Sequence, residues 1–207
     1  MAEYVAINSR HGLFLKIPPG VYFEEAAQSQ PTTEDLHMLE QGEITLGVPI
    51  VVLGTGPIAV TVVQGAKAAG ASPLIVTRLS LDKDQPPLAK SLGADETIDV
   101  EKKDPVAKEK TMTGGLGAAK VFEVSGSHQA FQQGLEMLLK MGKLLTFGIY
   151  PEDISIDFSR KVVREMKVIR GVRRVRFGRE QSLALYGLRS DQGRPFDHLS
   201  ITPGASR

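Results

Sequence analysis

The 207-residue sequence contains no cysteine. Disulfides, thiolate catalysis and metal sites with cysteine ligands are therefore excluded within this chain. A surplus of charge is also missing, because 25 lysines and arginines face 24 aspartates and glutamates, for a formal net charge of +1. No global field therefore favours nucleic acid or an acidic membrane as a partner. Charged residues interrupt the N-terminus before the apolar stretch of a signal peptide develops, so we expect a cytoplasmic protein.

One long stretch without charged side chains is present, the 18 residues from Leu46 to Val63. Its length is close to that of a membrane-spanning helix. Gly54, Gly56 and Pro57 lie at its centre, however, where a lone helix would lose propensity and a backbone hydrogen bond. The β-branched run before Gly54 is typical of a buried strand, and apolar residues recur at helical spacing after Pro57. The stretch therefore predicts a strand, a glycine turn and a helix, and no membrane span.

Strand-like and helix-like segments alternate between residues 44 and 169. The predicted strands are Pro49–Leu53, Leu74–Thr77, Thr97–Val100, Ala119–Val124, Lys143–Phe147 and Lys167–Ile169. The predicted helices are Pro57–Ala69, Pro86–Leu92, Asp104–Met112, His128–Leu139 and Ser159–Glu165. This alternation predicts an α/β fold, a doubly wound parallel six-stranded Rossmann sheet with helices on both faces. Such a sheet binds ligands beyond the carboxyl ends of its strands, where the strand order reverses.

The segments on either side of this array carry weaker patterns. Residues 1–33 contain two short strand-like pieces, Tyr4–Ile7 and Leu13–Ile17, and the short helical stretch FEEAA. Residues 160–179 hold nine lysines and arginines against one glutamate. They lack aromatic interleaving and a recognition motif, so nucleic acid is not an expected partner. The polar tail after Arg189 predicts poor order.

The glycine turn predicts a phosphate-binding loop. Residues 54–59 read Gly-Thr-Gly-Pro-Ile-Ala and match G-x-G-x-x-G/A between a strand and a helix. Gly54 permits the sharp turn, and Gly56 lets a pyrophosphate approach the backbone. The helix that opens at Pro57 and Ile58 offers unpaired N–H groups and the positive end of its dipole. A glycine turn without a ligand is the alternative, but within this β/α array we expect a dinucleotide cofactor.

The end of the second strand bears on which dinucleotide binds. A carboxylate at this position would bind the ribose 2′-hydroxyl of NAD, but Arg78 stands there. Arg78, with Ser80 and Lys83 nearby, favours the 2′-phosphate of NADP. In the alternative, Arg78 is a solvated side chain and Asp82 reaches the ribose of NAD.

Five motifs carry a family resemblance by their order and spacing: VVLGTGPIAV, AKAAGAS, LAKSLGADETIDV, VFEVSGS and KLLTFGI. They resemble the cofactor domain of the medium-chain dehydrogenases/reductases, most nearly the zinc-type alcohol, sorbitol and threonine dehydrogenases. The resemblance covers about residues 2–190. It implies a remnant of a β-rich, GroES-like catalytic domain over residues 1–33 and an NAD(P)-binding Rossmann domain over 34–171. A C-terminal helix and tail, over 172–207, would be an incomplete return to the catalytic domain.

By position, the resemblance assigns the nicotinamide half of the cofactor to two loops. The loop after the fourth strand would face the nicotinamide-side ribose and contains Ser125, Gly126 and Ser127. The loop after the fifth strand would meet the carboxamide and contains Phe147, Gly148 and Ile149. Without the resemblance, the first is an ordinary loop and the second a strand end.

The resemblance also implies a catalytic zinc, whose ligands this chain does not supply. In the family an earlier segment holds the metal with a cysteine and a histidine–glutamate pair, and the metal polarises the substrate oxygen. Gln30 stands where the sorbitol-type branch has a glutamate at or beside the zinc. His37 occupies the position of a family histidine, and we expect it to be structural. No metal ligand and no catalytic residue is therefore assigned.

Two functions from different classes follow from the sequence. The family-level function is NAD(P)-dependent hydride transfer between nicotinamide and a small alcohol, polyol or carbonyl substrate. The alternative is a truncated, catalytically silent dinucleotide-binding module, which the missing zinc ligands favour. A face left uncovered by the absent domain would be apolar, and we expect it to favour association into a homo-oligomer.

Overall fold

In the computed structural model of the protein, the described residues are residue 6 and residues 15–82, 85–157, 164–171 and 177–187. The chain divides into two compact units. One comprises residues 1–33 and 174–207, and the other comprises residues 34–173. Within the described ranges, no helix has the length and apolar character needed to cross a membrane.

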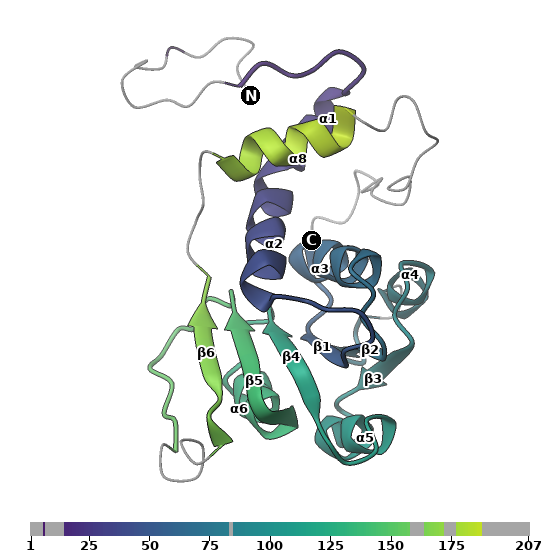
Figure 1. Ribbon diagram of the computed structural model, residues 1–207, viewed down its shortest axis with the longest axis vertical. Helices are drawn as coiled ribbons and strands as arrows, with labels where there is room; N and C mark the ends of the chain where they lie inside the picture. The colour runs from purple at the N-terminus through teal and green to yellow at the C-terminus, as the bar shows by residue number, and fades with distance from the viewer. Residues whose placement is uncertain (1–5, 7–14, 83–84, 158–163, 172–176, 188–207) are drawn as a thin grey trace. The chain divides into compact units, whose positions relative to one another are not determined.

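The unit of residues 34–173 is built on a six-stranded parallel sheet with the order β3-β2-β1-β4-β5-β6 (Figure 1). The strands are β1 (Ile50–Leu53), β2 (Leu74–Arg78), β3 (Glu96–Asp99), β4 (Ala118–Glu123), β5 (Leu138–Thr146) and β6 (Lys167–Arg170). The helices between them are α3 (Pro57–Ala68), α4 (Gln85–Ser91), α5 (Pro105–Met112) and α6 (His128–Met137). Successive strands run outward from β1 in one direction and from β4 in the other, which is the Rossmann order. The predicted parallel Rossmann sheet is confirmed.

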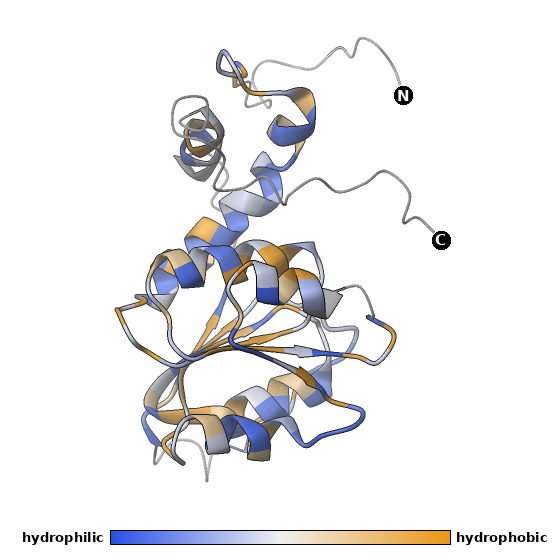
Figure 2. Cartoon of the chain, turned by 90° about the vertical axis from the view of Figure 1, so that its right-hand side faces the viewer, coloured by the Kyte–Doolittle hydropathy of each residue, from blue (hydrophilic) through white to orange (hydrophobic). Residues whose placement is uncertain are grey.

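Helices cover both faces of this sheet (Figure 2). Alternate strand residues point to opposite faces, so Ile50 and Val52 pack with α3 and α4, whereas Val51 and Leu53 pack with α5 and α6. All four side chains are fully buried. Burial on both faces explains why β1 is a continuous apolar run without polar alternation.

The prediction was wrong where α6 meets β5. The sequence pattern extends the helix to Leu139 and starts the strand at Lys143, but α6 ends at Met137 and β5 begins at Leu138. Leu138 pairs with Ala118 on β4, ahead of a shift in register. Its side chain is fully buried in the layer under α6. Leucines spaced for a helix can also serve a buried strand, so the apolar pattern did not distinguish the two.

The regular secondary structure among the described residues of the unit formed by residues 1–33 and 174–207 is helical. The FEEAA stretch forms α1 (Phe23–Ala27), as predicted, and the Glu25 carboxylate accepts a hydrogen bond from the Tyr22 N–H at 3.0 Å. Helix α2 (Ser29–Gly42) was not predicted from the sequence; it begins in this unit and ends in the other. Helix α8 (Phe177–Gly187) approaches α2 where the Ser182 hydroxyl donates to the Ser29 carbonyl at 3.1 Å.

Several predictions fall wholly or mainly outside the described residues. They are the strand-like pieces Tyr4–Ile7 and Leu13–Ile17, most of the helix over Ser159–Glu165, and the tail after Arg189. The part of residues 1–33 that the structure describes contains no strand, so a β-rich remnant of a second domain is not seen in it.

A buried carboxyl group joins α2 to α3. Asp35 is 2% exposed and accepts a hydrogen bond from the Thr61 hydroxyl. Its other oxygen, Oδ1, has no hydrogen-bond partner in the part of the chain that the structure describes. Burial, and to a smaller extent the charge of Glu34, raises the pKa of Asp35 well above its ordinary value of 3.8. The folded protein therefore binds this proton more tightly than the unfolded chain does.

Replacing Asp35 by asparagine is expected to stabilise the protein at neutral pH. Because the folded pKa is raised, wild-type stability falls as the pH rises from the unfolded pKa through the folded one. Asp35→Asn has no such titration. Its free energy of unfolding should match wild type below about pH 4 and exceed it by about 1 kcal/mol or more at pH 7.5, the scale for a poorly satisfied buried group.

Urea unfolding at the two pH values measures this difference. Glu136→Gln is the control, because it removes an exposed carboxylate from α6 and should change stability little at either pH. An Asp35→Asn effect of the same size at both pH values would contradict the raised pKa.

Candidate functional site

A cavity of about 370 Å³ lies at the carboxyl ends of the strands, where β1 and β4 are neighbours. The chain order reverses between these two strands, and open α/β sheets bind ligands at this point. The walls come from the loops after β1, β2 and β4 and from the first turns of α6. Five of the predicted site residues line the cavity: Gly54, Gly56, Arg78, Ser125 and Ser127.

The glycine loop brings bare backbone to the cavity. Gly54 has a φ of +122°, a conformation that favours glycine. A Cβ at Gly54 would lie 3.3 Å from the Cβ and the N of Ser125, so the loop after β1 packs directly on the loop after β4. Gly56 is the N-cap of α3, and a Cβ built on it meets no described atom within 4 Å. The loop can therefore admit an anion in front of the helix N-terminus.

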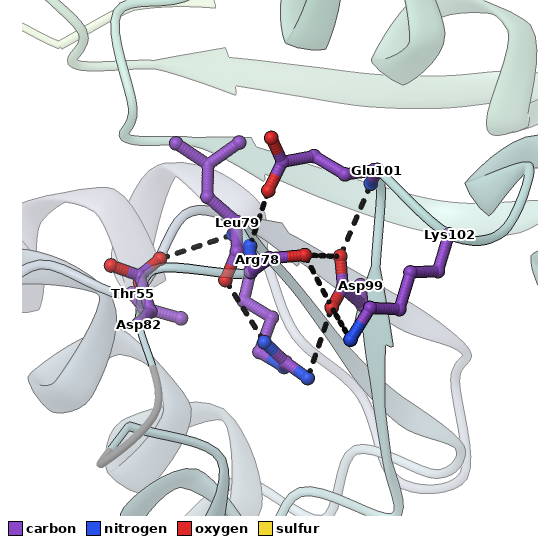
Figure 3. Close-up of polar contacts among 8 residues, drawn as sticks. Thr55, Arg78, Leu79, Asp82, Asp99, Glu101 and Lys102 are labelled. Carbon is purple, nitrogen blue, oxygen red and sulfur yellow. Dashed lines mark hydrogen bonds and ion pairs between the residues drawn. The ribbon is translucent and has the colours of Figure 1, made fainter.

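The cavity wall at the end of β2 is strongly charged (Figure 3). Arg78 forms an ion pair with Asp99 at 3.2 Å and donates to the Leu79 carbonyl at 2.9 Å. Both carboxylate oxygens of Asp99 also lie 2.9 Å from the Ser80 hydroxyl, whose single proton they share. Burial alone would raise the pKa of Asp99, but these hydrogen bonds and the nearby cations outweigh burial and lower that pKa. Arg78 therefore lines the cavity while held by a carboxylate, and Ser80 is turned toward Asp99.

Asp82 lies at the same wall, beside the glycine loop. Its Oδ2 accepts hydrogen bonds from the Thr55 hydroxyl at 2.8 Å and from the Leu79 N–H at 3.1 Å. Thr55 is the middle residue of the Gly-Thr-Gly turn. Arg78 and Asp82, the two alternatives for contact with the cofactor ribose, thus line one cavity. Lys83 lies outside the described residues.

The remaining predicted residues do not line the cavity. Pro57 and Ile58 form the first turn of α3, where Ile58 packs against the core. In the loop after β5, Phe147 also packs against the core and Ile149 is 87% exposed. Gly148 instead packs on the loop after β4, because a Cβ there would lie 2.5 Å from the Cα and N of Gly126. The two loops assigned to the nicotinamide half are therefore in contact.

Two buried carboxylates at strand ends were missed from the sequence. Asp99 is the last residue of β3 and 6% exposed, and Glu123 is the last residue of β4 and fully buried. Each is the last residue of its strand, at the edge where ligands bind, and this position was the available signal. Gln129 and Gln133 of α6 also line the cavity and were missed.

The described residues do not fit a zinc ion. Nowhere among them do three histidine, aspartate or glutamate side chains gather as a metal-ligand group. Gln30 and His37, the positions that the resemblance places near the family's zinc, belong to no such group. The zinc expected from the resemblance therefore has no group of ligands among the described side chains.

Comparison with known proteins gives a family match over most of the chain. Residues 57–185 match the model of a family described as zinc-binding dehydrogenase. The erythritol/L-threitol dehydrogenase of Mycolicibacterium smegmatis is 35% identical over 159 residues, and the sorbitol dehydrogenase of Rattus norvegicus is 34% identical over 155. These alignments cover 77% and 74% of this chain but 43% of each relative. The chain spans about half the length of the curated relatives it matches.

A solved structure shares the fold. A protein of Sinorhizobium meliloti 1021, described as a zinc-binding dehydrogenase bound to NADP, matches with a TM-score of 0.77 and 24% identity. The match covers 84% of this chain and 51% of that one. At this identity the likeness shows the common fold alone.

Gly56→Asp is expected to keep α3 folded and to abolish dinucleotide binding. Aspartate is a favoured N-cap residue, and its Cβ meets no described atom, so the thermal midpoint should stay within about 3 °C of wild type or rise. Its carboxylate would occupy the N–H groups and repel a diphosphate by about 4 kcal/mol per charge pair at 4 Å and an effective dielectric of 20. Titration calorimetry should show the affinity for NADPH and NADH at least ~100-fold lower.

Gly56→Ser separates the charge from the added Cβ. Serine also caps a helix well but carries no charge, so we expect a smaller loss of affinity, about 10-fold. Unchanged dinucleotide binding by Gly56→Asp would show that the diphosphate does not lie at this loop.

Proposed function

The chain belongs to the zinc-binding dehydrogenase family, and from that premise we propose that residues 34–173 bind NAD(P) for hydride transfer to or from a small alcohol, polyol or carbonyl substrate. The observation that carries the proposal is the cavity between β1 and β4, where open space at Gly56 adjoins the N-terminus of α3. Bound nicotinamide supplies the hydride acceptor or donor, and the protein supplies binding and orientation. The names of the two polyol dehydrogenase relatives support a polyol substrate.

The residues around the cavity have separate roles in this proposal. Backbone N–H groups at the start of α3 bind the diphosphate, and Gly54 and Gly56 keep side chains out of its way. The loop that contains Ser125, Gly126 and Ser127 faces the nicotinamide-side ribose. The backbone of residues 147–149, held against Gly126, orients the carboxamide. Each role uses a group at the carboxyl edge of the sheet.

A second candidate function is a catalytically silent dinucleotide-binding module. It is favoured by the absence of a metal-ligand group from the described residues, and no step of our proposal passes through zinc. Measuring NADPH formation from NADP⁺ with erythritol and sorbitol, with and without added zinc, separates the two. Turnover supports the dehydrogenase, whereas binding without turnover supports the silent module. The division at residues 33 and 171 and the cytoplasmic location stay predictions.

We propose that the cofactor is NADP and that Arg78 contacts its 2′-phosphate. Arg78 lines the cavity at the end of β2, and its guanidinium is held there by the ion pair with Asp99. An arginine presents several donors to a phosphate in a fixed geometry. The fold relative from Sinorhizobium meliloti was solved with NADP bound. The competing assignment gives the ribose of NAD to Asp82.

Arg78→Gln is expected to weaken NADPH binding about 10- to 100-fold, because a charge-assisted hydrogen bond to a phosphate contributes about 1.5–3 kcal/mol. Affinity for NADH should change less than about threefold. Lys102→Gln is the matched control, since Lys102 also approaches Asp99, at 3.4 Å, but its side chain is 68% exposed and does not line the cavity. Fluorescence titration of wild type and both variants with NADPH and with NADH measures these affinities.

Equal losses in Arg78→Gln and Lys102→Gln would show that net charge, and not contact with Arg78, determines the preference. Asp82→Asn tests the competing assignment. If Asp82 binds the ribose hydroxyls, this variant should lose NADH affinity and Arg78→Gln should not distinguish the two cofactors.

A further inference from the structure

A carboxylate with no exposed surface ends β4. Glu123 lies one residue before the loop that lines the cavity, and it does not itself line the cavity. Its Oε1 accepts three hydrogen bonds, from the Ser125 N–H at 2.8 Å, the Ser125 hydroxyl at 2.5 Å and the Gly126 N–H at 3.0 Å. One oxygen of Glu123 therefore holds the turn of the loop after β4.

The other oxygen of Glu123 faces the loop after β5. Oε2 accepts hydrogen bonds from the Tyr150 hydroxyl and, at 3.4 Å, from the Thr146 hydroxyl. These two hydroxyls are also 2.6 Å apart. Burial, reinforced by the hydrogen bond to Glu123, raises the pKa of Tyr150, so its hydroxyl keeps the proton that it donates. The backbone carbonyl of Glu123 accepts from the Phe147 N–H at 2.9 Å.

The two loops held by Glu123 touch each other without intervening side chains. A Cβ at Gly126, whose φ is +73°, would lie 2.7 Å from the Ile149 carbonyl oxygen. A Cβ at Gly148 would lie 2.5 Å from the backbone of Gly126. Because neither loop leaves room for a side chain at the contact, a shift of one loop must displace the other.

The chemistry of this network requires a carboxylate. All of the side-chain partners of Glu123 are hydrogen-bond donors, and they divide between its two oxygens. A glutamine side chain has one acceptor oxygen and an N–H₂ group, so it satisfies one loop and presents donors to the other. Burying a carboxylate is strongly unfavourable unless such bonds offset it. An apolar residue would fill the same space without the free-energy cost of burying a charge. The network therefore points to a positioning role.

We propose that Glu123 is a positioning residue for the nicotinamide half of the dinucleotide. It acts through Ser125 and Gly126 on one side and through Tyr150 on the other. It fixes the two loops relative to each other before the nicotinamide binds. The inference rests on the proposed function, because it takes the assignment of these loops to the nicotinamide half from there.

The test separates the two halves of the cofactor. Whole dinucleotides, NADPH and NADH, are titrated calorimetrically alongside 2′,5′-ADP and ADP, which contain no nicotinamide. Glu123→Gln should weaken binding of whichever dinucleotide wild type binds more tightly, by about 10-fold or more. Its affinity for the matching fragment, 2′,5′-ADP for NADPH or ADP for NADH, should stay within about twofold of wild type. It should also reduce the change in reduced-nicotinamide fluorescence on binding, which reports the surroundings of the ring.

Two further variants control for loss of structure. Glu109→Gln changes another glutamate with no exposed surface, on α5 and not lining the cavity. It should change the affinity for neither the dinucleotides nor the fragments. Tyr150→Phe keeps the Glu123 carboxylate and removes one donor, so it should give a smaller loss, about threefold, again confined to the dinucleotide. If Glu123→Gln does not fold, Tyr150→Phe by itself tests the inference.

The outcomes distinguish this inference from the proposed function. If wild type binds the dinucleotide, and Glu123→Gln and Tyr150→Phe weaken dinucleotide and fragment equally or not at all, the positioning role is overturned and the proposed function stands. If wild type binds neither dinucleotide nor fragment, the proposed function fails and this inference fails with it.

Discussion

The close contact between the loops after β1 and β4 is the constraint on which the candidate site depends. Neighbouring parallel strands lie roughly 4.8 Å apart, so the loops that leave them at the same edge must pack together. Gly54 meets this requirement because a Cβ would stand 3.3 Å from Ser125. Gly126 and Gly148 meet it again at the next contact. The cavity is consequently framed by backbone, which suits a ligand that is bound through main-chain N–H groups.

Carboxylates at strand ends hold these loops in place. Where a strand leaves the sheet, the N–H groups of the following residues lose their ladder partners and need other acceptors. Glu123 accepts from two such N–H groups after β4, and Asp99 accepts from the Glu101 N–H after β3. Asp82, which lies within the loop after β2, accepts a hydrogen bond from the Leu79 N–H. Hydrogen bonds to an ionised acceptor are stronger than neutral ones, so these side chains order the loops around the cavity. Of the three, Asp82 also lines the cavity.

Much of the fold could be predicted from the sequence, but less of the site. The alternation of buried strands and amphipathic helices predicts the sheet, and the Gly-Thr-Gly-Pro turn predicts the loop that lines the cavity. The register that places Arg78 beside Asp99 could not be predicted, because the two residues are far apart in the sequence. The start of β5 at Leu138 was also missed, since its leucines fit a helix as well as a strand. Helix α2 was missed because its sequence, Ser29–Gly42, carries little apolar pattern.

The sequence by itself determined where β1, the glycine turn and α3 lie, because β-branched runs, glycine and proline act on the local backbone. Tertiary structure alone decided what the charged side chains do. Parallel pairing sets Arg78 against Asp99 and turns Ser80 toward the same carboxylate. It also brings the Tyr150 and Ser125 hydroxyls to opposite oxygens of Glu123. Such contacts depend on strand order and register, which place residues side by side without regard to their separation along the chain.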